Sequence, residues 1–270
     1  CDDRPFPDAL LSTPSFFIDR EDRKKKAKRT VAEVVRTKVE ELNPLLGDCP
    51  VVSMSELTDD FLKDFSIVVC SRMGSLKEAI RISNATVANG GKFYMVDTFG
   101  FSGASVFDLG SNHTYRPEMG KKLLPEVGLK EHLPLETVLQ EIPLDHATNR
   151  FHKSPPAQWV QYRCLLEYIE TKGEWPSAET AADFVEFCTE WIQKSAPSLL
   201  DTHPSLTETA LLNLARTATS EIAPVCSVVG GILGNEIIKA ISSKGEPANN
   251  TILFDGVSCK LWEFLVKPKA

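Results

Sequence analysis

Hydrophobic residues follow two different spacings in the first half of the chain. Ile67-Val68-Val69-Cys70 and Phe93 to Val96 are short apolar runs of the kind found in strands buried on both faces. Between them, residues 75–89 place Leu76, Ala79, Ile80 and Val87 on one side of a helix, and Gly90-Gly91 is a suitable stop. A strand, a helix and a strand within about 30 residues predict a parallel βαβ unit.

Other segments also have a clear period. Helices are expected from Lys24 to Leu42, over residues 157–171 and 206–217, and from Val225 to Ile241 after Pro224. The strongest signal is the face formed by Ala181, Phe184, Val185, Cys188, Trp191 and Ile192. Strands are expected from Ala104 to Leu109, Thr251 to Phe254 and Ser258 to Val266, with Asp255-Gly256 as a two-residue hairpin turn.

These elements predict an α/β fold with a helical insert. We expect an extended lead-in over residues 1–15 and an α/β part over 16–110. A loop and helical insert should occupy residues 111–219, of which Ser111 to Pro143 has no clean period. A C-terminal helix and hairpin at 220–270 should then complete the α/β domain.

Charge and composition exclude some classes of function. The chain has 270 residues and a net charge of -7, which argues against general nucleic-acid binding, and the basic run Arg20 to Arg29 is typical of a solvated helix start. No run approaches the about 18 apolar residues of a membrane span, so no membrane partner is expected. The seven cysteines contain no CxxC pair, which favours reduced intracellular thiols over a disulfide framework or a zinc site. No signal peptide is visible, and the first residue is Cys1 rather than Met, so an N-terminal truncation is expected.

Gly230-Gly231-Ile232-Leu233-Gly234 is the first candidate site. A dinucleotide fingerprint needs G-x-G-x-x-G at a strand-to-helix junction, whereas this order is G-G-x-x-G within an apolar stretch. We therefore favour a role in close helix packing over nucleotide binding.

Single polar residues give weaker signals. The five histidines His113, His132, His146, His152 and His203 lack metal-ligand spacing, and a surface or loop role is expected for each. Cys70 is expected to be a buried structural thiol. Asp97 ends a predicted strand, where it could face a ligand crevice or cap the following turn.

The stretch from Ser220 to Ala240, with Ala223-Pro224-Val225-Cys226 and Val229-Gly230-Gly231, resembles ThiF-type activating enzymes for ubiquitin-like modifiers. Asn249-Asn250 followed by Phe254-Asp255-Gly256 is most similar to the small-subunit family of SUMO-activating heterodimers. Glu41-Leu42-Asn43-Pro44 and the Asp97 to Gly103 block agree. The resemblance implies an incomplete Rossmann-like (ThiF-type) adenylation fold.

In that family the large subunit binds ATP and Mg, adenylates the modifier and forms a thioester, while the small subunit is not catalytic alone. The resemblance therefore implies that this chain binds no cofactor by itself, pairs with the large catalytic subunit, contacts SUMO only indirectly, and works in the nucleus and also the cytoplasm. The implied partner interface comprises Phe99, Gly100, Phe101, Gly103, Pro224, Gly230, Gly231 and Gly234.

The chain departs from the family pattern at its start. The arginine-bearing helix and first Gly-rich turn have no counterpart, and Arg4 matches no motif that would give it the arginine role. Two alternatives stay open: a degenerate scaffold paralogue without activity, and a regulatory subunit for another modifier such as the Nedd type. Missing central strands would leave the strands at Ile67 and Phe93 partly uncovered, which predicts a marginal or aggregation-prone isolated chain.

Overall fold

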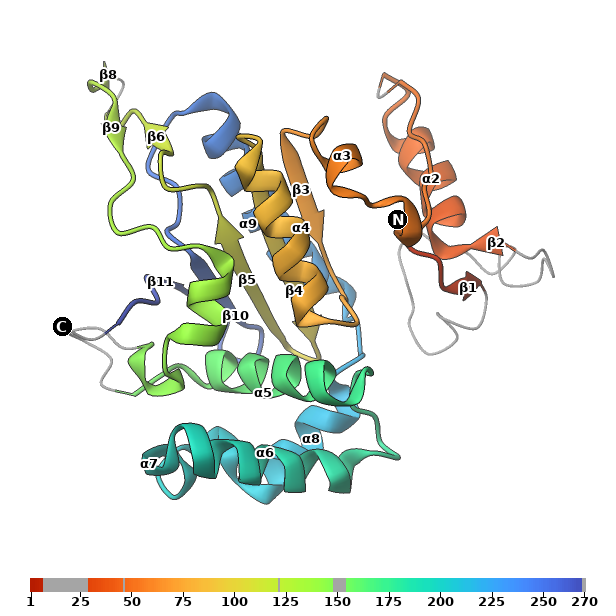
Figure 1. Ribbon diagram of the computed structural model, residues 1–270, viewed down its shortest axis with the longest axis vertical. Helices are drawn as coiled ribbons and strands as arrows, with labels where there is room; N and C mark the ends of the chain where they lie inside the picture. The colour runs from red at the N-terminus through yellow and green to blue at the C-terminus, as the bar shows by residue number, and fades with distance from the viewer. Residues whose placement is uncertain (7–28, 46, 121, 148–153, 269–270) are drawn as a thin grey trace.

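A mixed β-sheet forms the centre of the molecule in the computed structural model, which describes residues 1–6, 29–45, 47–120, 122–147 and 154–268 (Figure 1). The sheet has the strand order β11-β10-β5-β4-β3. Its strands are β3 (Ile67–Cys70), β4 (Lys92–Phe99), β5 (Ser102–Asp108), β10 (Thr251–Asp255) and β11 (Lys260–Phe264). β3 and β4 run parallel, and the remaining neighbours are antiparallel. The expected α/β class is confirmed, since the chain combines a central mixed sheet with helices.

The predicted βαβ unit is confirmed. Helix α4 (Leu76–Ala88) connects β3 to β4, and the hydroxyl of Ser75 accepts a hydrogen bond from the Glu78 amide at its start. The chain leaves α4 through Gly90, whose φ of 79° lies in the left-handed region that glycine tolerates. β4 continues three residues beyond the predicted end at Val96, because its last residues pair with the start of β5.

Helices cover both faces of this sheet. On one face α4 and α5 (Ala157–Lys172) pack in a single large core that includes Phe93, Val106 and Trp159. On the other face α9 (Ala223–Ser242) packs over Tyr94 and Phe107. Figure 1 shows α4 in front of the strands and α9 behind them.

The helical insert begins with α5 and continues below it in Figure 1. It contains α6 (Ala181–Ser195), α7 (Pro197–Leu200), η5 (Pro204–Leu206) and α8 (Glu208–Thr217). The predicted inner face of α6 is confirmed for Phe184, Cys188 and Ile192, which are fully buried. These residues belong to the same core as the sheet residues beneath α5, so the insert and the sheet share their packing.

The segment from Ser111 to Pro143, which has no regular hydrophobic period, forms short elements together with the residues just after it. They are β6 (Thr114–Tyr115), β7 (Glu118–Met119), β8 (Lys122–Leu123), β9 (Val127–Gly128), the π-helical turn η3 (Thr137–Glu141) and the 3-10 turn η4 (Leu144–His146). β6 pairs with β9 and β7 with β8, which makes a ribbon at the edge of the molecule.

The N-terminal elements form a small core of their own. β1 (Pro5–Phe6) pairs with β2 (Arg29–Thr30), and α2 (Val31–Leu42) follows, capped by the Thr30 hydroxyl. η2 (Met54–Glu56) and α3 (Asp59–Leu62) lead to β3. The helix predicted from Lys24 corresponds to α2, which begins at Val31; the prediction is wrong for residues 29 and 30, which form β2. Residues 24–28 and the basic run up to residue 28 lie outside the described residues.

Two expectations for the C-terminal part are wrong. Asp255 pairs with Lys260, so residues 256–259 form a longer loop in place of the two-residue turn at Asp255-Gly256. By length and composition α9 is apolar enough to cross a membrane, whereas no such run was expected. One such helix is weak grounds for a span, since core helices pass the same test, and here Val225, Val229 and Leu233 of α9 pack against the sheet.

Candidate functional site

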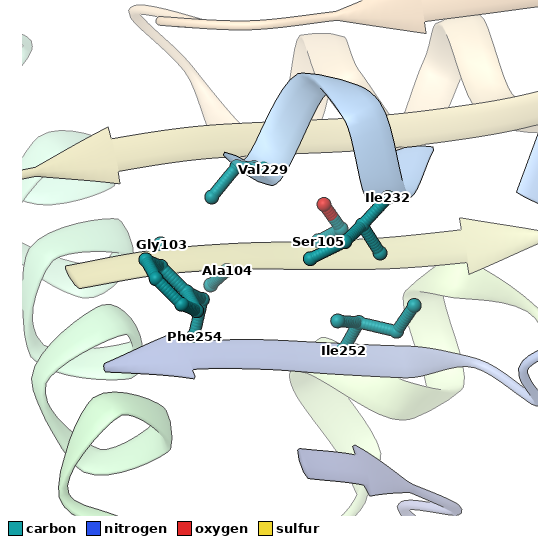
Figure 2. Close-up of a pocket in the computed structure, with 7 residues that line it drawn as sticks. All are labelled: Gly103, Ala104, Ser105, Val229, Ile232, Ile252 and Phe254. Atoms are coloured by element: carbon teal, nitrogen blue, oxygen red, sulfur yellow. The ribbon is translucent and has the colours of Figure 1, made fainter. Parts of the chain in front are cut away.

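The inner face of α9 fits closely onto the sheet. Val225, Val229 and Leu233 recur every four residues along the buried side of the helix. Figure 2 shows Val229 and Ile232 pointing from α9 toward β5. A Cβ atom added to Gly103 would lie 2.5 Å from Cγ2 of Val229, so glycine at this position permits the close approach. The hollow that remains has a volume of about 10 Å³, which is room for no more than one water molecule.

The outer face of α9 is apolar and uncovered. Val228, Ile238 and Ile241 are 42%, 64% and 66% exposed. Pro224, Gly230 and Gly231 are also exposed, Gly234 is partly exposed, and Cβ atoms added to the three glycines would meet nothing within 4 Å. The expected role of these glycines in close packing of the helix against a sheet or another helix is therefore wrong for the described residues, and they lie in the interior of a helix instead of at a strand-to-helix junction. Because glycine has no side chain, the helix surface at these three positions is a shallow depression between larger side chains. Another element could pack closely against this depression.

The turn from Phe99 to Gly103 lies beside the start of α9. Phe99 is buried and stacks on Tyr162 with 5.9 Å between ring centroids. Gly100 adopts a φ of 58° and its amide donates a hydrogen bond to the carbonyl of Ser220. Phe101 is 57% exposed, so it is the member of this turn whose side chain a partner can contact.

Sequence reasoning missed several exposed apolar residues around this surface. The amide of Gly256 donates a 2.7 Å hydrogen bond to the Phe101 carbonyl, which brings the β10–β11 loop to the turn. Val257 in that loop is 78% exposed, and Leu261 on β11 is 43% exposed. The signal that could have found Val228 and Ile238 is the apolar character of α9 on several sides, since a helix on a sheet needs only one apolar face.

Asp97 is a structural carboxylate. Its Oδ1 accepts a hydrogen bond from the Arg72 amide and its Oδ2 accepts one from the Tyr162 hydroxyl, both at 2.7 Å. Burial raises the pKa of this carboxyl, while the two hydrogen bonds and the Arg72 charge oppose the shift. Asp97 thus ties the loop after β3 to α5 and does not face an open crevice.

Arg72, whose amide binds Asp97, also makes contacts through its side chain. Its φ of 56° is unusual for a residue with a side chain, and its Nη1 donates a hydrogen bond to the Ala218 carbonyl. The guanidinium lies 4.6 Å from the ring centroid of Trp175. These contacts fix the end of β3 against the helical insert.

A cavity of about 360 Å³ lies beside this strand end, lined in part by Arg4, Cys70 and Arg72. The Arg4 guanidinium is paired with Asp2 at 2.6 Å. Burial and the nearby Asp97 charge raise the pKa of the Cys70 thiol to about 12, which makes it a poor nucleophile. Cys70 is therefore confirmed as a buried structural thiol.

His113, His132 and His203 lie in loops, as the expectation of a surface or loop role allowed, but none of the three is on the surface. His113 and His203 are buried, and the His132 side chain is only 2% exposed. The Leu109 amide donates to Nε2 of His132, so Nδ1 carries the proton that is shared with Asn249. His152 lies outside the described residues, and within the described part no three His, Cys, Asp or Glu residues form a group that could hold a metal ion.

No family model matches the chain, but a comparison with curated proteins finds several that are similar to it. The similar proteins are named SUMO-activating enzyme subunit 1. The Xenopus laevis protein is 28% identical over 248 residues, covering 83% of this chain and 70% of the relative. The human protein is 25% identical over 252 residues, covering 85% and 71%. The Arabidopsis thaliana subunit 1B-1 is 28% identical over 266 residues, covering 92% and 76%. The resemblance seen in the sequence is confirmed.

Proposed function

We propose that this chain is the non-catalytic subunit of a heterodimeric SUMO-activating enzyme. In this role it supports ATP-dependent adenylation and thioester transfer of SUMO by a large catalytic subunit. The similarity to proteins named SUMO-activating enzyme subunit 1, over 83% to 92% of the chain in the three relatives above, carries the proposal. The fold is compatible with an incomplete Rossmann-like, ThiF-type domain, since it contains the parallel βαβ unit.

The polar residues at the strand ends already have structural partners, which supports a non-catalytic role. The two carboxylate oxygens of Asp97 accept hydrogen bonds from Arg72 and Tyr162, and burial keeps the Cys70 thiol protonated. ATP and Mg would then be bound by the large subunit, and SUMO would be contacted only through the assembly. We expect the assembly in the nucleus and also in the cytoplasm.

The outer face of α9 is the partner surface that we propose. Phe101, Pro224, Gly230 and Gly231 remain candidate contacts because they are exposed, and Gly234 is partly so. Phe99, Gly100 and Gly103 are buried and would act by holding the turn and the helix in place. Val228 and Ile238 extend the candidate interface along the helix.

Co-purification with the large subunit of a SUMO-activating enzyme, followed by an ATP-dependent SUMO thioester assay, tests this proposal. Ile238→Asp places a charge on the exposed outer face of α9, within the proposed interface, and should reduce co-purification and thioester formation together. Leu45→Asp is the matched control, because Leu45 is 94% exposed and lies just after α2, away from α9. It should leave both unchanged.

The outcomes separate the proposal from its alternatives. Co-purification with thioester formation supports a working small subunit. Co-purification without activity would identify a degenerate scaffold, and activity only with the Nedd-type large subunit and modifier would reassign the chain to that pathway. Failure to bind any large subunit would overturn the proposal.

A further inference from the structure

The exposed face of α9 has small residues toward its start and large residues toward its end. Ile238 and Ile241 are 64% and 66% exposed, and we call them the large half of this face. The small half consists of residues without a bulky side chain, all of them exposed except Gly234, which is partly exposed: Ala223, Ser227, Gly230, Gly231 and Gly234. The two halves share one side of the helix, because their members follow one another mostly at three- or four-residue steps.

This exposed face carries no charge. The charged residues of α9 are Glu236 and Lys239, and they bind each other across 2.6 Å. The Glu236 side chain is only 4% exposed and also accepts a hydrogen bond from the Ala248 amide, so it lies on the inner side of the helix. The whole chain has a net charge of -7. An uncharged face is therefore a place where two copies of this acidic chain can meet without placing like charges against each other.

The apolar surface continues beside the start of α9. Val228 on the helix, Phe101 in the turn after β4 and Val257 in the β10–β11 loop are 42%, 57% and 78% exposed. The helix itself has 20 residues, which corresponds to a length of about 30 Å. An exposed apolar patch of this kind marks an interaction surface, and charged residues are depleted at the core of such surfaces.

A second copy of α9 that runs antiparallel to the first fits this face. A two-fold axis through the middle of the helix brings Ile238 of each copy opposite Ser227 of the other, and Ile241 beside Ala223. Each large half then packs on a small half, and the glycines meet at the crossing, where they allow the two backbones to approach closely. Parallel copies would set Ile238 against Ile238 and leave the two small halves facing each other across a gap.

We propose that the chain on its own forms a two-fold symmetric homodimer in which the exposed faces of two α9 helices pack antiparallel. The large half of each copy fills the small half of the other. This inference goes beyond the proposed function, because it concerns the chain without any partner. Since the face is the same one, a large subunit could bind only a chain that has been released from its second copy.

Sedimentation equilibrium on the full chain measures the dimer. The wild type should follow a monomer–dimer equilibrium, and Ile238→Asp should raise the Kd of the dimer at least about tenfold, because it buries a charge in both equivalent contacts. Leu45→Asp is the matched control, since Leu45 is 94% exposed and lies away from α9. Val69→Lys changes the β3 edge and should also leave the dimer intact, which separates this dimer from association through the sheet edge.

A pair of complementary variants tests the antiparallel geometry. Ser227→Lys places a cation opposite residue 238 of the other copy and should weaken the dimer of that variant alone. An equimolar mixture of Ser227→Lys and Ile238→Asp should recover the dimer, because the introduced lysine then faces the introduced aspartate. Both positions are exposed, so the fold is retained, and thermal melting of each variant checks this.

The outcomes decide the proposal without involving the large subunit. A wild-type chain that stays monomeric at all concentrations, or a dimer that Ile238→Asp leaves unchanged, would overturn it. Failure of the mixture to recover the dimer would overturn the antiparallel arrangement. Association that disappears entirely in Val69→Lys would belong to the sheet edge and would likewise overturn the proposal. Co-purification with a large subunit is measured separately, so its failure would leave the homodimer standing.

Discussion

The hydroxyl of Tyr162 donates a hydrogen bond to Oδ2 of Asp97 across 2.7 Å, with both side chains buried in the core. Tyr162 lies on α5 and Asp97 on β4, so this bond connects the helical insert to the central sheet. Burial, the Asp97 charge and this hydrogen bond raise the pKa of Tyr162, which therefore stays protonated and remains the donor. The pair joins two parts of the chain that the sequence separates by a long irregular segment.

Tyr162→Phe should lower the free energy of unfolding by about 1–3 kcal/mol, because it leaves Oδ2 of buried Asp97 without its partner. Urea unfolding followed by tryptophan fluorescence measures the change. Tyr168→Phe is a matched control, since its hydroxyl donates to Asp183, whose side chain is 47% exposed. The control should cost less than about 0.5 kcal/mol. Equal losses in the two variants would contradict the structural role of the Tyr162–Asp97 bond.

Local patterns in the sequence predicted the elements well. The run Ile67–Cys70 and the period of residues 75–89 depend on neighbours a few residues apart, and both elements formed as expected. The length of β4 was underestimated because its last residues are held by pairing with β5. The hairpin was recognised, but its loop was not, because the pairing of Asp255 with Lys260 depends on register rather than on the Asp-Gly signal alone.

Long-range contacts could not be predicted from the same patterns. α9 is apolar on several sides, so its period could not show that Gly230 and Gly231 face outward while Val229 faces the sheet. The burial of His132 depends on Leu109 and Asn249, which lie 23 and 117 residues away in the chain. The burial of Arg163 on α5, with Nε and Nη1 unpartnered among the described residues, likewise becomes visible only in the folded structure.

His113 should make the protein less stable as the pH falls from about 6.5 to 4. Burial, followed by the charges of Lys92 and His132, lowers the pKa of His113 from 6.5 to about 4. Within this window the unfolded chain binds a proton that the folded chain does not, so acidification favours unfolding. His113→Gln should reduce the loss of unfolding free energy between pH 7 and 4.5 by about 1–3 kcal/mol. Urea titrations at several pH values measure this, and identical pH profiles for the variant and the wild type would contradict it.

The free edge of β3 should promote self-association of the isolated chain. β3 is an edge strand of the sheet in the described part of the chain, and Val69 on it is 45% exposed. Unpaired strand edges with apolar side chains recruit further strands. Val69→Lys should therefore reduce association at rising concentration, measured by sedimentation velocity, whereas Leu45→Lys removes an equally apolar residue away from the sheet and should not. A monomeric wild-type chain with cooperative melting at all concentrations would disprove this prediction.

Substitutions at Gly103 and Gly230 should separate the inner from the outer face of α9. A Cβ atom at Gly103 would lie 2.5 Å from Val229, so Gly103→Ala should displace the helix and destabilise the fold by about 1–3 kcal/mol. Gly230 is in the middle of the helix with open space around it, so Gly230→Ala should stabilise the fold by about 0.5–1 kcal/mol.

The two variants should differ in another way when the large subunit is present. Gly103→Ala should lose stability and co-purification together, because the misplaced helix no longer presents its outer face. The Gly230→Ala variant should be more stable and still co-purify less well, since the added methyl group fills the shallow depression at the glycines of the proposed interface. Thermal melting and co-purification measured on the same samples distinguish these cases. If Gly230→Ala raised the melting temperature and left co-purification unchanged, the partner would have to contact a different part of this surface, such as Phe101 and Val257 beside the start of the helix.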